Sequence, residues 1–211
     1  MSILNFQRPE KIILQKSDDF NGTFEFKPLE PGFGQTIGNS LRRVLLSSLE
    51  GYAISAIRIA GVDHEFATIK GVVQDMVDII LNLKQIRLKA LVETEEDSED
   101  KVYLTISGKE VFVAGDIEDQ TTVFKIMNPE LVICDMEPSV NLEIELTISK
   151  GRGYVPAEEN LPKDAPIGVI PVDAIYTPIK RVSYKVENTR VGQRTDYEKL
   201  MLDVQTDGTI H

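Results

Sequence analysis

The side chains that could carry out catalysis are few and widely scattered in this sequence. There are two histidines, His64 and His211, which are too few for the histidine cluster that holds a catalytic metal. The one cysteine, Cys134, lies in the apolar stretch LVICDM, which favours a small core residue over a nucleophile. No serine stands in a Gly-x-Ser-x-Gly pattern. The residues therefore predict neither a metal site nor a covalent nucleophile, and a single cysteine excludes an internal disulfide.

Phosphate binding and acid–base chemistry have only weak signals. Residues 32–34 (GFG) and 151–153 (GRG) could hold an anion with backbone N–H groups, but neither continues into the Gly-Lys-Ser/Thr of a phosphate loop. No cofactor is therefore predicted. Carboxylates are plentiful, yet no spacing singles out a working pair. Asp173, beside a long loop, is the candidate for carboxylate chemistry, and its alternative is a turn cap or an ion pair with a neighbour such as Arg181.

Taken together, these residues favour a binding or assembly protein over an enzyme. Two other classes stay open: a free-standing carboxylate-based enzyme that uses Asp173, and a peptide-binding β module that adds a peptide strand to a sheet edge. A ligand held at Asp173 would favour the enzyme, and a peptide strand on a sheet edge would favour the module.

Composition is that of a soluble protein of one large domain or two small ones, with 211 residues, 42% of them hydrophobic and 27% charged. The formal net charge of -11 opposes direct DNA contact, because such contact depends on Lys and Arg neutralising phosphates. Six of the eight residues 93–100 are acidic, which is typical of a solvated hairpin tip. The N-terminus lacks the apolar core of a secretory signal, and no run approaches a membrane span. A cytoplasmic protein without membrane contact is expected.

The stretch most able to position a function is residues 29–51, LEPGFGQTIGNSLRRVLLSSLEG. On a helix its apolar side chains cover an arc of roughly 200°, whereas a surface helix shows a stripe only somewhat wider than about 100°. The apolar residues are Ile37, Leu41, Val44, Leu45, Leu46 and Leu49. Two explanations are open: a helix between its own sheet and a second chain, or a central helix inside its own domain. We expect the helix to stop near Glu50, with Gly51 as a left-handed cap.

The other elements follow from hydrophobic periodicity. Alternation and turn residues predict strands at 11–16, 22–27, 53–60, 182–186 and 200–204, and short antiparallel strands throughout 86–149. Period 3.6 predicts a second helix over residues 72–83 that ends beside Lys84. Its apolar stripe is formed by Val73, Met76, Val77, Ile80 and Leu83. Residues 151–168, rich in Gly, Pro and charge, are expected to form a long irregular loop.

Residues 29–51 closely resemble the signature region of the bacterial DNA-directed RNA polymerase α subunit. The likeness continues, in the order of the family and from end to end of the chain, through GVDHEF, DIILNLKQIRL, GRGYVPAEEN, PIGVIPVDAIYTPIKRVSY, ENTRVGQRTDYEKL and DGTI. The resemblance implies an α+β fold of two interleaved domains. A mixed helix/sheet dimerisation domain, residues 1–50 and 168–211, would be interrupted by a β-rich insert domain, residues 51–167.

The resemblance also implies a non-catalytic role in transcription. Such α subunits form a homodimer that is the platform for assembly of the β and β′ subunits, and nucleotidyl transfer belongs to β and β′. Contacts to the second α chain and to β would fall on Arg42, Arg43, Leu45, Leu46 and Leu49. Contacts to β′ would fall on Lys84, Val172 and Asp173.

The family pattern extends beyond this sequence. Family members continue past the DGTI turn into a further helix that packs beside the first helix, then into a linker and a small DNA-binding C-terminal domain. The sequence here stops at His211. We therefore expect part of the apolar arc of the first helix to be uncovered, and no direct DNA contact from this region.

Overall fold

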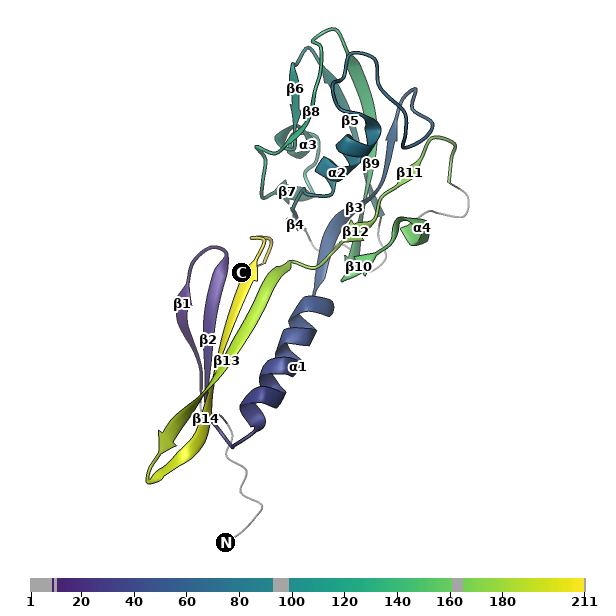
Figure 1. Cartoon of the computed structure of the whole chain (residues 1–211). Helices are drawn as coiled ribbons and strands as arrows, with labels where there is room; N and C mark the ends of the chain where they lie inside the picture. The colour runs from purple at the N-terminus through teal and green to yellow at the C-terminus, as the bar shows by residue number, and fades with distance from the viewer. Residues whose placement is uncertain (1–8, 10, 93–98, 161–164, 211) are drawn as a thin grey trace. The chain divides into compact units, whose positions relative to one another are not determined.

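The computed structural model describes residues 9, 11–92, 99–160 and 165–210 (Figure 1). Helices combine with antiparallel sheets, so the predicted α+β class is confirmed. Most of the acidic run, at residues 93–98, lies outside the described residues. Among the described residues, no helix has the length and apolar character needed to cross a membrane.

The chain divides into two compact units. The first unit combines Met1–Leu49 with Thr177–His211, and the second unit is Glu50–Tyr176. The second unit extends beyond the expected boundary after residue 167, because backbone pairing holds the following segments in it. In particular, β11 (Ile170–Pro171) pairs with β3 (Glu50–Ile59), and β12 (Ala174–Ile175) pairs with β10 (Tyr154–Val155).

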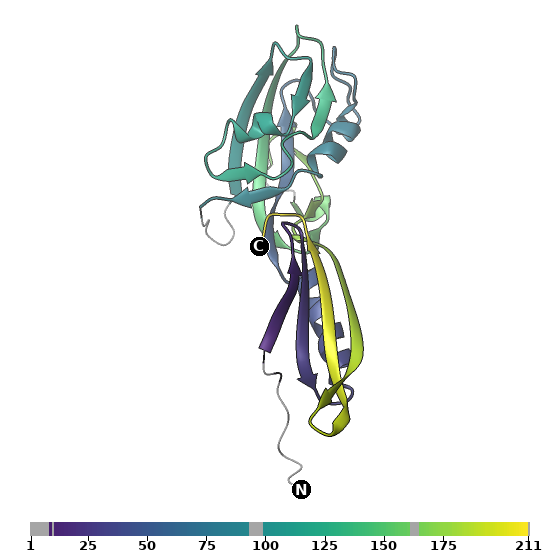
Figure 2. The same cartoon turned by 90° about the vertical axis from the view of Figure 1, so that its left-hand side faces the viewer.

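The first unit is one antiparallel sheet with a helix on one face (Figures 1 and 2). Its strands lie in the order β1 (Lys11–Ser17), β2 (Asn21–Leu29), β14 (Arg194–Thr206) and β13 (Ile179–Val191). Two strands from the start of the chain thus pair with two from its end, as purple beside yellow in Figure 2. The strands predicted in these regions are confirmed. Helix α1 (Phe33–Ser47) packs against β13 and β14.

Helix α1 ends earlier than predicted, and Gly51 does not cap it. Its C-cap is Ser48, and Gly51 lies inside β3 (Glu50–Ile59). Gly51 is instead required for a close approach, because a Cβ there would lie 1.9 Å from the backbone oxygen of Tyr176. The left-handed glycine of this helix is at its other end, where Gly32 has φ 87°.

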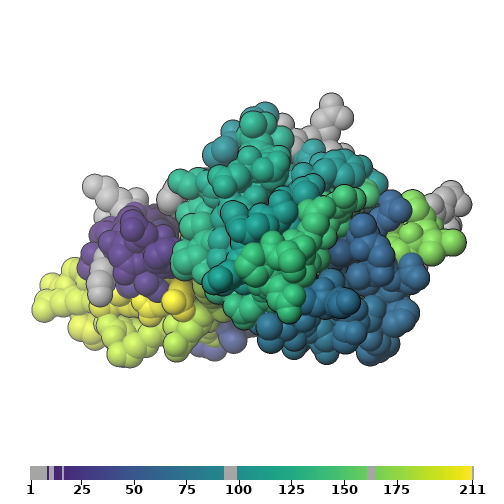
Figure 3. Space-filling model, turned by 90° about the horizontal axis from the view of Figure 1, so that it is seen from above, coloured from purple at the N-terminus to yellow at the C-terminus, as the bar shows by residue number. Residues whose placement is uncertain are grey.

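The second unit is built on a larger antiparallel sheet. Its strand order is β5 (Glu99–Ser107), β9 (Asn141–Arg152), β3, β4 (Leu88–Ala90) and β7 (Phe124–Ile126), with β11 also on β3. The prediction of short antiparallel strands here is confirmed. Alternate residues of β5 and β9 are buried in one apolar core, and helix α2 (Met76–Leu83) packs into the same core. Blue, teal and green segments pack side by side on the surface of this unit (Figure 3).

Smaller elements complete the second unit. They are α2 (Met76–Leu83), α3 (Gly115–Glu118), α4 (Ala157–Asn160), the paired strands β6 (Val111–Val113) and β8 (Val132–Asp135), and β10 (Tyr154–Val155). The stretch 151–168, expected to be an irregular loop, therefore contains the end of β9, all of β10 and the short helix α4.

Helix α2 begins later than the hydrophobic pattern predicts. The side chain of Asp75 accepts a hydrogen bond from the backbone N of Asp78 at 2.8 Å, and this N-cap starts the helix at Met76. Val73, placed in the predicted stripe, lies before the helix and is 79% exposed. Ile79, left out of the stripe, is buried. The N-cap at Asp75 sets the start of the helix, and hydrophobic periodicity alone does not reveal a cap.

Candidate protein-interaction site

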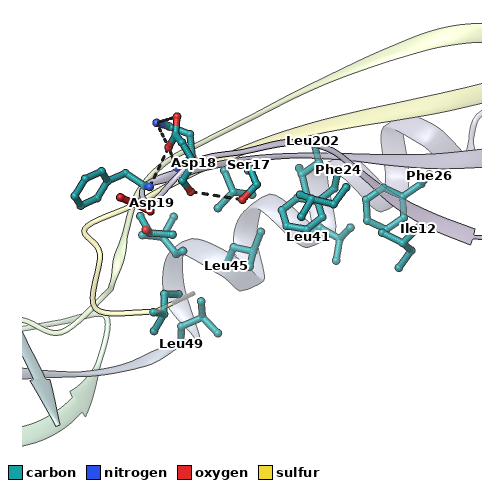
Figure 4. A pocket seen from close by; sticks show the side chains of 18 residues that line it. Ile12, Ser17, Asp18, Asp19, Phe24, Phe26, Leu41, Leu45, Leu49 and Leu202 are labelled. Carbon is teal, nitrogen blue, oxygen red and sulfur yellow. Dashed lines mark hydrogen bonds between the residues drawn. The ribbon is translucent and has the colours of Figure 1, made fainter. Parts of the chain in front are cut away.

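An open apolar groove of about 850 Å³ lies beside α1 in the first unit (Figure 4). We call it the α1 groove. Its walls include Ile12, Phe24, Phe26, Leu41, Leu45 and Leu202. It exists because α1 lies over β13 and β14, beside the face that β1 and β2 present. Ile12 and Leu14 on the edge strand β1 also line the groove and are 62% and 53% exposed, so the groove presents a continuous apolar surface.

Two glycines let α1 approach its sheet closely. The only buried residues of α1 are Gly34 and Gly38. A Cβ at Gly34 would lie 2.7 Å from Val186 Cγ1, and a Cβ at Gly38 would lie 2.6 Å from Tyr184 Cδ2. The backbone of α1 therefore rests directly on β13 and β14. Residues three and four apart lie on the same face of a helix. The positions that follow Gly34 and Gly38 on this face therefore point toward the groove.

The N-terminus of α1 is held by a carboxylate from another element. Glu198 on β14 accepts hydrogen bonds from Gly32 N at 2.8 Å and from Gly34 N at 2.7 Å, one on each carboxylate oxygen. The helix has no side-chain N-cap of its own and no acidic residue in its first turn. Gln35 adds a second link, because its Nε2 donates to the hydroxyl of Tyr184 at 2.7 Å. Sequence reasoning missed Glu198, since its partners are more than 160 positions away.

The structure brings together the residues that the resemblance assigns to contacts with the second α chain and with β. Leu45, Leu46 and Leu49 are half-buried and pack against the apolar cluster of the first unit. Arg42 and Arg43 are exposed. Val44, on the same helix, is 52% exposed. The helix therefore combines apolar side chains at the groove with two exposed guanidinium groups, and contact with another chain stays a prediction.

The residues assigned to β′ also meet, in the second unit. Lys84 Nζ lies 2.5 Å from Asp173 Oδ2, and the Tyr154 hydroxyl donates to the same oxygen at 3.4 Å. Both charged side chains are partly exposed. The side chain of Val172 is buried, its backbone N donates to Ser55 O at 2.8 Å, and its carbonyl accepts from Asn160 Nδ2 at 2.7 Å. Val172 thus anchors the segment that presents Asp173.

Other groups considered for chemistry are buried in the core or held in ion pairs. Burial raises the pKa of the Cys134 thiol to about 11, so this thiol is protonated at neutral pH. At residues 151–153, Arg152 pairs with Glu50, and Lys150 Nζ lies 2.9 Å from the same carboxylate. These two cations hold the pKa of Glu50 below its usual range. In the described part of the chain, no group of three His, Cys, Asp or Glu residues could hold a metal ion.

One exposed apolar segment of the second unit was also missed. Phe66 is 77% exposed and, with Val73, precedes α2. Phe66 lies in the GVDHEF motif, but a lone phenylalanine at that place has no periodic signal that separates a surface position from a core one.

Comparison with known proteins identifies the family. Residues 57–177 match the profile of the RNA polymerase Rpb3/RpoA insert domain. This chain belongs to the bacterial RNA polymerase α-subunit family. Over its full length it is 59% identical to the DNA-directed RNA polymerase subunit alpha of Cytophaga hutchinsonii and 56% identical to that of Flavobacterium psychrophilum. The same subunit of Salinibacter ruber is 48% identical. The chain spans 63% of the length of these relatives, and the resemblance read from its motifs is confirmed.

Proposed function

We propose that this chain is the assembly region of a DNA-directed RNA polymerase α subunit, which homodimerises and serves as the platform for the β and β′ subunits in transcription. The observation that carries the proposal is the α1 groove with the helix beside it. Family membership supports the polymerase assignment, and catalysis of nucleotide addition is assigned to β and β′. The α1 helix and its groove are assigned to dimerisation.

The apolar surface of the first unit supports an intermolecular role. Val44 on α1 and Ile12 on β1 remain more than half exposed after the sheet has covered its face of the helix. Burying such surface stabilises an association by about 25 cal/mol per Å² before the cost of ordering both partners. A second copy brings the same helix and groove, as a two-fold symmetric dimer requires.

A segment that follows the DGTI turn is assigned a place in the same surface. Ile210, near the end of the chain, itself lines the α1 groove. The chain spans 63% of the length of the Cytophaga hutchinsonii relative. We assign the helix that follows in the family to the groove beside α1, where it would cover part of the exposed apolar wall.

The charged residues are assigned to the larger subunits. Arg42 and Arg43 are exposed, and a guanidinium group can pair with a carboxylate through two parallel hydrogen bonds. They are assigned to β. Lys84, Asp173 and the segment anchored by Val172 are assigned to β′.

Leu46→Asp tests the dimer and β assignment. A carboxylate at this half-buried position would be desolvated in the interface, so we expect loss of the dimer and loss of β binding. The measurements are light scattering after size-exclusion chromatography and co-purification with β. Leu91→Asp, at a 60% exposed leucine of the second unit, is the matched control. If the Leu46 variant dimerises and retains β like the control, the interface assignment is wrong.

A further inference from the structure

We infer that Glu198 is a positioning residue for the interaction face of α1, which it holds in one rotational and axial setting on the sheet. The inference rests on the proposed function, because it concerns the helix assigned to dimerisation. Glu198 itself lies on β14, among neither the leucines nor the arginines assigned to partners, and acts through the helix backbone.

The carboxylate of Glu198 holds the end of α1 at two points. Its two oxygens accept from two amides of the same helix end, Gly32 N and Gly34 N, at 2.8 and 2.7 Å. One hydrogen bond would leave the helix end free to pivot about it. Two bonds from one rigid, planar group fix both the height and the rotation of the first turn relative to β14.

The contact between the first turns of α1 and the sheet needs this restraint. Over its first two turns, α1 buries glycines in place of large side chains. Gly34 and Gly38 allow a close approach, but a glycine has no side chain that could interdigitate with the side chains of the sheet and fix the rotation of the helix. Gln35, bonded to Tyr184, adds a second polar link between these turns and the sheet. Glu198, with its two hydrogen bonds, supplies a large part of the rotational restraint on these turns.

The orientation of the first turn also determines where the side chains at the far end of the helix lie. The 15 residues of α1 span ~22 Å, and successive residues are ~100° apart around the axis. A rotation of a few tens of degrees would shift Leu45 away from the groove and change which side chains face a partner. A dimer needs both copies in the competent setting, so a mixed population weakens association even when each chain stays folded.

The experiment compares the dimer dissociation constants of Glu198→Gln and Glu187→Gln in the full-length protein. Both variants remove one negative charge from the β13–β14 pair. Val186 faces α1, so the side chain of its neighbour Glu187 lies on the opposite face of the sheet. A glutamine offers one acceptor and places an NH₂ group against the second amide. We expect the dimer dissociation constant to rise about tenfold for Glu198→Gln and to stay at the wild-type value for Glu187→Gln.

Amide hydrogen exchange separates positioning from general destabilisation. We expect faster exchange at Gly32 and Gly34 in Glu198→Gln, with exchange in the core strands at wild-type rates. Glu198→Asp, with a carboxylate one methylene shorter, should give an intermediate dissociation constant, and it serves if the glutamine variant does not fold. Unchanged dimerisation in both Glu198 variants would overturn the inference. Failure of the wild-type protein itself to dimerise would instead overturn the proposed function.

Discussion

At the scale of single residues, two glutamates on neighbouring strands have different roles. Glu198 faces α1 and receives amide hydrogen bonds, whereas Glu187 lies on the other face between Lys185 and Lys199, each at 2.8 Å. Hydrogen bonds and charge from these two lysines lower the pKa of Glu187 to about 2. The three side chains join β13 to β14, so these ion pairs form when the two strands pair and are lost when the chain unfolds.

The lowered pKa of Glu187 predicts a pH-dependent contribution to stability. Because the folded-state pKa lies below the unfolded value of 4.5, the contribution is complete above pH 4.5 and is lost as pH falls through about 2. Glu187→Gln should therefore lower the free energy of unfolding slightly at pH 7, by an amount limited by solvent screening, and have a much smaller effect at pH 2, where most of the contribution is lost. Urea denaturation at both pH values measures this.

The control for this titration is Glu143→Gln. Glu143 is an exposed carboxylate of the second unit that forms no ion pair among the residues the structure describes. A loss of stability that is equal at pH 7 and pH 2 in Glu187→Gln would contradict the ion-pair explanation.

At the scale of elements, the position of α1 depends on the absence of side chains at its contact face. Gly34 lies against Val186, and Gly38 lies against Tyr184 and Leu200. Because α1 lies this close to the sheet, the leucines in its second half also contact the sheet, and the groove lies beside them. Glycine is otherwise unfavourable inside a helix by about 1 kcal/mol relative to alanine, so the close packing must offset this cost.

Gly38→Ala tests this packing. The added Cβ would lie 2.6 Å from Tyr184 Cδ2 and 2.9 Å from Leu200 Cδ1, so α1 or these side chains must move. We expect a net loss of about 1–3 kcal/mol in the free energy of unfolding, despite the better helix propensity of alanine. Ser40→Ala, at an exposed position of the same helix, should be neutral or slightly stabilising. Thermal and urea unfolding of the two variants give the comparison, and a stabilised Gly38 variant would contradict the packing argument.

At the scale of the whole molecule, the residues assigned to different partners belong to different units. The leucines and arginines of α1 lie in the first unit, and the Lys84–Asp173 pair lies in the second. Each unit has its own apolar core. Substitutions at the two sites should therefore affect different associations.

Lys84→Ala tests this separation. Loss of the lysine leaves the partly exposed carboxylate of Asp173 without its cation, so we expect about tenfold weaker association with β′ and an unchanged dimer. Lys125→Ala removes an exposed lysine from β7 of the same unit and should change neither association. Reconstitution with purified β and β′ provides the readout. Weakened dimerisation in Lys84→Ala would show that the two sites are coupled.

The sequence by itself determined the class of the fold, most strands and both main helices. These follow from local periods of two and 3.6 residues, which are visible within a window of about ten residues. The wide apolar arc of α1 also indicated that the helix has more than one packing surface. The ordered blocks of residues determined the family.

Tertiary structure alone decided where those surfaces lie. The hydrogen bonds from Gly32 and Gly34 to Glu198 join positions more than 160 residues apart, and no local pattern encodes such a pair. The burial of Val172 and the need for glycine at Gly51 likewise depend on segments brought beside them by folding. Periodicity specifies which side chains must be buried, whereas the partner that buries them is specified only when distant strands pair.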